Sequence, residues 1–473
     1  MKPAALTLAG IALGLFWFWL PVVWLVIPVG MAAWWMSREI RGSRFHSLLA
    51  AMLIIAALVR VAAVLGNGIL ADRFAGPNEP WDLIPDGSVY ASYGEYIAEL
   101  VTGHTGPPTY KVLVHRVENT GLWPAWNGYQ VTGMSYWNGL WFSLFSTTPA
   151  ATRLINCLAS LMAAVLLFRF MRRRFDERAA ALVLGGLLFY PTLAVWAASG
   201  AKEWLVVLLS IVFLLALDPF AAWPIGRRHI GLAALMAASA AATYFLRAYV
   251  ALLLVGTAGL VLLWRIAVHA WSTRRPAIRA LLIVSAIGAA AAGWHRAVAG
   301  TEQFYQHSLR SSVAHYAVDP AGATGYRLYP KRFYEQDYAR LPSVGPNSDL
   351  IRLSPKQKIV TALLGMARFF FSPYPSDLAR SRALYAVYPL ALLNLALLPF
   401  VVAGALWGLR TPASGLLPLT VFMILISFVI GLHSGNVGTV VRVKDMAMPF
   451  YFVLAAVGIG RIFNWRTHAV SVV

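Results

Sequence analysis

Residues 47–66 read SLLAAMLIIAALVRVAAVLG, a run in which the only charged side chain is Arg60. A helix that crosses a bilayer needs about 20 predominantly apolar residues, so this run predicts a transmembrane helix. Of the 473 residues in the chain, 59% are hydrophobic and 12% are charged. Soluble domains carry about 25% charged residues. The composition therefore predicts an all-α polytopic membrane protein.

Similar apolar runs recur on both sides of this segment. We predict further spans at 150–170, 179–197, 203–222, 229–246, 248–266, 279–298, 384–408, 414–433 and 446–463. Residues 5–36 form either one long tilted helix or a hairpin broken near Pro21, which brings the total to eleven or twelve. No repeat or linker divides the chain, so we expect a single membrane domain over 1–473.

Basic residues lie on alternate loops between these spans. They are Arg38, Arg41, Arg44, Arg169, Arg172, Arg173, Arg174, Arg178, Arg227, Arg228, Arg265, Arg274, Arg275, Arg279, Arg410, Arg461 and Arg466. Cytoplasmic loops of membrane proteins carry such an excess of Lys and Arg. We therefore expect these loops to be cytoplasmic, in a cytoplasmic (inner) membrane, with the active face on the other side. A net charge of +20 in a soluble protein would suggest nucleic acid. Here the charges flank spans and do not gather on one face, so we expect no nucleic-acid partner.

Two long loops fall on the outer face, 67–133 and 299–383. The first holds seven acidic and three basic residues, and the second holds six acidic and eleven basic residues. Both are rich in Tyr, Trp and Pro, which favours folded loops over disorder. One loop is thus net acidic and the other net basic.

The first outer loop contains the segment Ile84-Pro85-Asp86-Gly87-Ser88-Val89-Tyr90. Asp86 is placed to cap a helix that follows, or to act as a general base whose pKa is raised by nearby apolar surface. Asp72, closer to the preceding span, is the alternative acid. Apolar and aromatic residues then recur at helical spacing, at Val89, Tyr93, Tyr96, Ile97 and Leu100. We expect this face to lie along the membrane surface.

Four further segments follow the acidic loop in an order that is shared with a known family. They are Ala151–Asn156, Tyr190–Trp196, Gly200–Glu203 and Gly435–Arg442. Together with the acidic loop, they resemble the GT-C superfamily of integral membrane glycosyltransferases, in the layout of residues 47–300 and again just before the last span. Within that group, the bacterial protein-mannosyltransferase, aminoarabinose-transferase and exopolysaccharide-associated members are the most similar. Members often carry two adjacent acids in the first outer loop, whereas Asp86 is single.

The resemblance implies an inverting transfer of a sugar from a polyprenyl-phosphate donor to a glycan, lipid or protein acceptor at the outer face of the membrane. It implies that Asp86 deprotonates or orients the acceptor hydroxyl, with Tyr90 near the acceptor or sugar. Some relatives use a divalent metal, and the sequence shows no ligand set for one. No Walker A loop, zinc-binding helix or serine-hydrolase elbow occurs in the chain.

Cations at the outer ends of spans are candidates to bind the donor phosphate. Arg247 lies in a tight turn between two spans, where it either contacts phosphate or extends to lipid headgroups. Lys202 either pairs with the adjacent Glu203 or contacts the donor. Arg442 is preferred to Lys444 because its guanidinium can hold two phosphate oxygens. In the second loop, Tyr326 and Arg327 belong to a run of rings and cations that suits either a sugar phosphate or an interfacial belt.

Two other functions remain open. An O-antigen or exopolysaccharide polymerase would also use outer loops and arginines, and would make product ladders. A transporter of lipid-linked sugars would carry charge in mid-membrane and broken helices. We expect Arg60, Arg153 and Arg296 to lie near the ends of spans, which ranks transport third.

Overall fold

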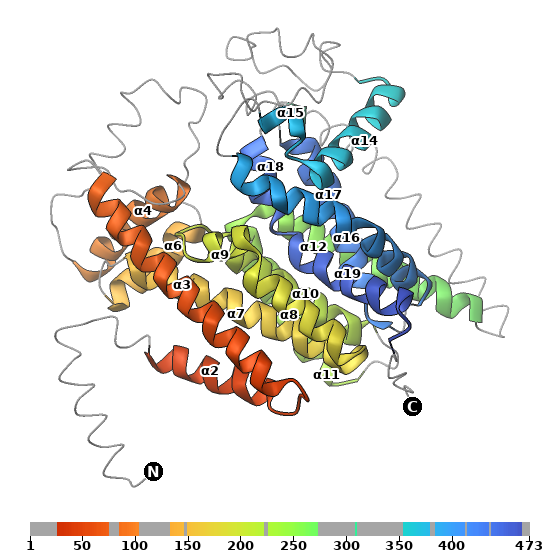
Figure 1. Ribbon diagram of the computed structural model, residues 1–473, viewed down its shortest axis with the longest axis horizontal. Helices are drawn as coiled ribbons and strands as arrows, with labels where there is room; N and C mark the ends of the chain where they lie inside the picture. Colours follow the sequence, from red (N-terminus) through yellow and green to blue (C-terminus); the bar gives the residue numbers. More distant parts are fainter. Residues whose placement is uncertain are drawn as a thin grey trace. The chain divides into compact units, whose positions relative to one another are not determined.

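In the computed structural model, the described residues are 26–74, 85–103, 133–145, 149–221, 226–272, 308–309, 353–378, 384–411, 414–434 and 437–465. All regular structure among them is helical (Figure 1). The helices are α2 (Val26–Ile40), α3 (His46–Phe74), α4 (Pro85–Thr102), α6 (Gly133–Phe145), α7 (Pro149–Arg174), α8 (Glu177–Phe189), α9 (Pro191–Ala197), α10 (Glu203–Phe220), α11 (Arg228–Leu246), α12 (Ala248–Ser272), α14 (Pro355–Phe371), α15 (Pro375–Leu378), α16 (Leu384–Arg410), α17 (Leu417–His433), α18 (Val437–Lys444) and α19 (Met448–Ile462).

Six of these helices are long and apolar enough to cross a membrane. They are His46–Leu70, Ala150–Arg174, Glu203–Phe220, Arg228–Leu246, Ala248–Val268 and Leu384–Arg410. The bent pair α8 and α9 would make a seventh, and α17 and α19 are shorter apolar helices. Each coincides with a predicted span, which confirms an all-α, membrane-embedded protein. The predicted span at 279–298 and residues 5–25 lie outside the described residues.

The chain forms two compact units, each assembled from separate stretches. The first comprises Met1–Arg173, Ala180–Ile211 and Ala241–Ala248, and the second comprises Arg174–Ala179, Val212–Ala240 and Tyr249–Val473. The first unit contains helices α2, α3, α4, α6 and α9, and all of α8 except its first residues. The second unit contains α12, except for Ala248, and the helices from α14 to α19.

In the first unit, α3 is longer than the predicted span. It continues past Gly66 to Phe74, so the first outer loop begins later than residue 67. Asn67 is buried within the helix and donates to the carbonyl of Ala198 at 3.4 Å. The opposite side of α3 exposes large apolar residues such as Leu58 and Ile69, as expected of a helix that faces lipid.

Helix α4 packs on α6 through small residues. In α4 the buried positions include Gly87, Ala91, Gly94 and Ala98. A Cβ atom at Gly94 would lie 2.5 Å from the Cβ of Asn138, so the backbones of α4 and α6 are in close contact. Small residues permit such an approach between helices. The helical period is confirmed, and the expectation that the aromatic face lies along the membrane surface stays a prediction.

Arg60 lies in the middle of α3, not near a span end as expected. It is fully buried and donates to Ser160 Oγ at 2.9 Å and to the carbonyl of Leu188 at 3.0 Å. Leu188 lies just before the 59° bend between α8 and α9. Because Pro191 has no N–H, the end of α8 lacks helical donors, and its carbonyls carry partial negative charge. The Arg60 guanidinium supplies the missing donors.

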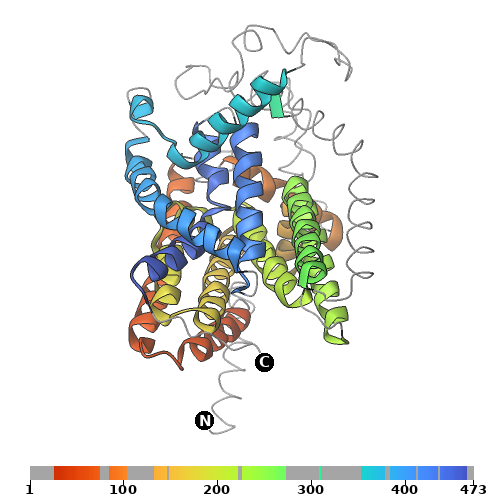
Figure 2. The ribbon, with the colours of Figure 1, turned by 90° about the vertical axis from the view of Figure 1, so that its right-hand side faces the viewer.

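In the second unit, close helix packing again depends on glycine. A Cβ at Gly404 of α16 would lie 2.1 Å from the carbonyl oxygen of Leu454 in α19. Helix α14 crosses α17 (Figure 2), where Gly365 faces the backbone of Gly431. Part of the predicted second outer loop is therefore folded, because α14 begins with a capping box at Ser354.

Candidate functional site

Lys202 connects two distant parts of the first unit. It lies in the turn between α9 and α10, and its Nζ is 5.0 Å from the centre of the Tyr90 ring in α4. Tyr90 is 5% exposed. A cation over an aromatic face is stabilised by the ring quadrupole, more strongly when the pair is shielded from water. The contact brings α4 to the turn before α10.

Glu203, the first residue of α10, pairs with Arg247 at the end of α11. The distance from Arg247 Nη2 to Glu203 Oε1 is 2.5 Å, and the two side chains are 11% and 5% exposed. Sequence adjacency suggested a Lys202–Glu203 pair, whereas this ion pair joins residues 44 positions apart. A buried carboxylate is stable as an anion only with such a partner.

Helix α6 contacts both α4 and the end of α11. A Cβ at its first residue, Gly133, would lie 2.5 Å from the carbonyl oxygen of Phe245, two residues before Arg247. Further along, α6 packs on α4 at Gly94. Contacts thus run from α4 to α6, to the end of α11, to the start of α10 and back to α4. We call Tyr90, Lys202, Glu203 and Arg247 the Lys202 cluster.

Helix α7 forms hydrogen bonds to the turn that carries Lys202. Asn156, which is fully buried, donates to the carbonyls of Ser199 and Ala201, both at 3.0 Å. Trp204 donates from its indole to the carbonyl of Leu193 at 2.7 Å. These bonds fix the backbone on either side of the turn. Sequence reasoning missed Asn156 as a supporting residue, although an amide inside an apolar run was a signal for it.

The predicted acids lie close to this cluster along the chain. Asp86 is in the first turn of α4, which begins at Pro85, so it is inside the helix and not its N-cap. Its backbone is one turn before Tyr90 on the same side of the helix. Asp72 is in the last turn of α3. The side chains of both acids, and residues Tyr326 and Arg327, lie outside the described residues.

Arg442 belongs to the second unit, where it is half-buried on α18. Lys444 at the end of that helix is 4% exposed and donates to the carbonyl of Ser372 at 3.0 Å. Burial lowers the pKa of Lys444 to about 8, and the neighbouring Asp445 acts in the opposite direction. Arg442 is thus the more accessible of the two cations, and its contact with a phosphate stays a prediction.

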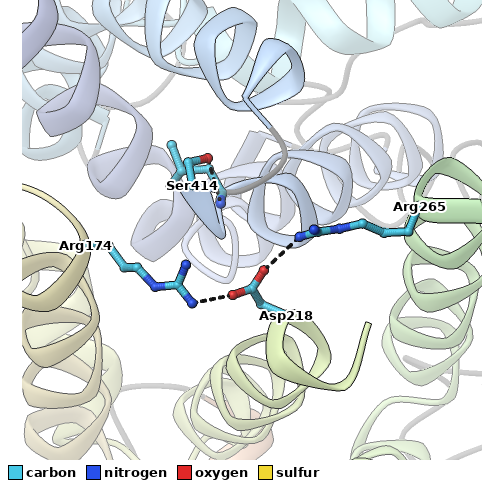
Figure 3. Close-up of polar contacts among 5 residues, drawn as sticks. Arg174, Asp218, Arg265 and Ser414 are labelled. Atoms are coloured by element: carbon cyan, nitrogen blue, oxygen red, sulfur yellow. Dashed lines mark hydrogen bonds and ion pairs between the residues drawn. The ribbon is translucent and has the colours of Figure 1, made fainter. Parts of the chain in front are cut away.

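A second charged group lies at the other end of α10. Asp218 accepts from Arg174 Nη2 at 2.7 Å and from Arg265 Nη2 at 3.2 Å (Figure 3). Given the helical rise, Asp218 is about 22 Å from Glu203 along α10. Arg174 and Arg265 were both assigned to inner loops, and they meet at one carboxylate. Arg174 ends α7, whereas Arg265 lies within α12. The predicted sidedness of the loops stays a prediction.

Among the described residues, no group of three or more His, Cys, Asp or Glu side chains could hold a metal ion. A metal bound by outer-loop carboxylates remains a prediction that concerns the rest of the chain. Comparison with models of protein families, with curated proteins and with solved structures finds no match for this chain.

Proposed function

We propose that the chain is an inverting, lipid-carrier-dependent glycosyltransferase of the GT-C type, which acts at the outer face of the cytoplasmic membrane. The observation that supports this most is the contact of Lys202 with Tyr90. It holds the Asp86-bearing helix beside cations that follow far along the sequence. An acid and a phosphate-binding group at one site are what the reaction requires.

In the proposed reaction, Asp86 accepts the proton of an acceptor hydroxyl. The hydroxyl oxygen attacks the anomeric carbon of the donor as the bond to the phosphate oxygen breaks, and polyprenyl phosphate leaves with the bonding electrons. Glu203 pairs with Arg247. Lys202 is the proposed contact of the leaving phosphate, and Arg247 and Arg442 are further candidates.

The test uses the full chain in lipid vesicles with synthetic polyprenyl phosphates that carry labelled glucose, galactose or mannose, and a membrane extract as acceptor. Transfer and release of polyprenyl phosphate are expected from the parent protein and not from Asp86→Asn. The matched variant Asp72→Asn distinguishes the two acids. Parental activity of Asp86→Asn would remove Asp86 from the role of base, and a ladder of products would indicate a polymerase.

Transport of a lipid-linked sugar is a second candidate, favoured by a specific observation. A buried arginine in mid-span beside a broken helix, as at Arg60 and Pro191, is a feature of transporters. Movement of an unmodified fluorescent lipid-linked sugar across protein-containing vesicles, without release of polyprenyl phosphate, would favour transport over transfer.

A further inference from the structure

Helices α2 and α3 are joined by a short turn that carries arginines on its surface (Figure 1). Arg38 lies in the last turn of α2, Arg41 and Arg44 follow it, and all three side chains are exposed. The turn itself is held by hydrogen bonds. Ser43 is buried, and its Oγ accepts from the N–H of Phe45 at 3.0 Å. The three arginines are therefore attached to a backbone that is already ordered.

The last turns of α7 bring three more arginines to this turn. Arg169 pairs with Glu39 at 2.7 Å, which joins α7 to the end of α2. Arg172 lies against the turn, because a Cβ atom at Gly42 would be 3.8 Å from Arg172 Nη1. Arg173 follows and is exposed. All of these residues belong to the first unit. We call Arg38, Arg41, Arg44, Arg169, Arg172 and Arg173 the α2–α3 turn surface.

The α2–α3 turn surface carries far more positive than negative charge. The stretches 34–46 and 165–173 contain its six arginines and a single carboxylate, Glu39, which gives a net charge of +5 with His46 neutral. The Arg172 guanidinium lies 5.6 Å from the centre of the Phe168 ring, and its Nη1 is enclosed without a hydrogen-bond partner. A cation that has lost water is stabilised by a nearby anion and destabilised by other cations. The surface therefore favours an anionic partner.

The apolar surroundings of the arginines indicate that the partner is a lipid. Trp34 of α2, over whose ring Arg38 lies, is exposed, and so is Met31 one turn earlier. On α3, Leu48 is exposed and belongs to the apolar side that continues to Leu58. The arginines thus lie at the edge of the lipid-facing surface, the level at which Trp is enriched and phospholipid headgroups are found. A headgroup phosphate would supply the anion, and its acyl chains would cover the apolar residues.

We propose that the α2–α3 turn surface binds the phosphodiester headgroup of an anionic phospholipid. Its four exposed arginines make the direct contacts, whereas Arg172 adds positive charge next to Gly42. Guanidinium groups suit this task, because each can donate two hydrogen bonds to neighbouring phosphate oxygens. The proposal does not depend on glycosyl transfer, since no residue of the Lys202 cluster takes part.

The test measures binding of fluorescent phosphatidylglycerol to the full chain in dodecyl maltoside micelles, with phosphatidylcholine that carries the same label as the neutral reference. The parent protein is expected to bind phosphatidylglycerol about ten-fold more tightly or better, since each arginine beside an anionic lipid contributes a factor of about five. The variant Arg38→Gln/Arg41→Gln/Arg44→Gln is expected to lose this preference. Equal binding of the two lipids by the parent, or an unchanged preference in the variant, would overturn the proposal.

The matched control removes three exposed arginines of the second unit, in the variant Arg227→Gln/Arg228→Gln/Arg410→Gln. It lowers the net charge by the same amount, so an equal loss of preference in this variant would attribute binding to net charge and overturn the proposal. Substitutions at exposed positions change stability little, so both variants should fold, which the unfolding temperature checks. If the first variant does not fold, Arg41→Gln alone decides the test, with an expected loss of about five-fold.

Two competition measurements separate a lipid site from a site for a soluble anion. Inorganic phosphate in large excess, at constant ionic strength, should displace little of the labelled lipid, because it has no acyl chains. Complete displacement would show that soluble phosphate is the ligand, and would overturn the lipid assignment. Raising NaCl from about 0.1 M to about 1 M should weaken binding, because the Debye length falls from about 10 Å to about 3 Å. An affinity that is independent of salt would contradict the role of the arginines.

Discussion

Glu203 and Arg247 form an ion pair in which both side chains are nearly inaccessible to water, with 2.5 Å between Oε1 and Nη2. The pair joins the start of α10 to the end of α11. Burial removes the hydration of both charges, so each depends on the other. The Lys202 cluster is therefore sensitive to changes that leave one of these charges without its partner.

We expect Glu203→Gln to lower the free energy of unfolding by about 3–5 kcal/mol, because it leaves a buried guanidinium without its counter-charge. The double variant Glu203→Gln with Arg247→Met should recover a large part of this loss. Unfolding by sodium dodecyl sulfate titration in mixed micelles measures both. The control is Glu39→Gln, whose pair with Arg169 is 14% and 33% exposed, and which should cost about 1 kcal/mol or less. Equal losses in the two single variants would contradict this prediction.

Removal of the Lys202 charge should weaken the proposed binding of phosphate. We expect Lys202→Met to reduce affinity for polyprenyl phosphate in nanodiscs about ten-fold, which corresponds to about 1.4 kcal/mol. Tyr90→Leu should have a smaller effect, through loss of the ring contact that orients Lys202, and Tyr90→Phe should have little effect.

The matched control is Lys356→Met, which removes an exposed lysine of α14. If that variant weakened binding as much as Lys202→Met, net charge and not the position of Lys202 would explain the result.

The Arg60 side chain and the break at Pro191 should be energetically coupled. Arg60→Met is expected to cost about 1–3 kcal/mol for each carbonyl that it leaves without a donor. Pro191→Ala restores a backbone N–H near the end of α8, so the cost of Arg60→Met should fall by about 1 kcal/mol in that background. A double-mutant cycle of unfolding free energies tests this, with Ser160→Ala as a variant that removes only the partner of Arg60 Nε. Strict additivity would disprove the coupling.

Lys444 should make stability depend on pH in the alkaline range. Its pKa is about 8 in the folded protein and 10.5 when unperturbed, so the unfolded chain binds more protons between these values. Stability therefore rises as pH increases from about 8 to 10.5, because the charged form that burial penalises is lost. Lys444→Met should lack this rise. The measurement is the unfolding free energy of both proteins across that range, and parallel pH profiles would contradict the assignment.

Much of the fold follows from local sequence pattern. Uninterrupted apolar runs predicted α3, α7, α10, α11, α12 and α16, because the length of an apolar run is itself the requirement for crossing a bilayer. The assignment of Arg174 and Arg265 to inner loops stays a prediction. In the structure Arg174 ends α7 and Arg265 lies within α12.

Other features had no local signal. The spacing of apolar and aromatic residues indicated the α4 helix, whereas the contact of Gly94 with α6 could not be read from that spacing, because it depends on how closely α6 approaches. Arg60 appeared to be a charge near a span end, and it lies in mid-helix because a break in α8 provides carbonyls for it.

The sequence by itself determined that this is a helical membrane protein, since hydrophobicity and charge act on each segment independently of the others. Only the tertiary structure decided that Glu203 pairs with Arg247, that Lys202 lies over Tyr90, and that Asn156 bonds to the carbonyls of Ser199 and Ala201. Those relationships join residues on different helices. Hydrogen bonds and ion pairs act over a few ångströms, so they depend on the packing of helices that sequence spacing does not specify.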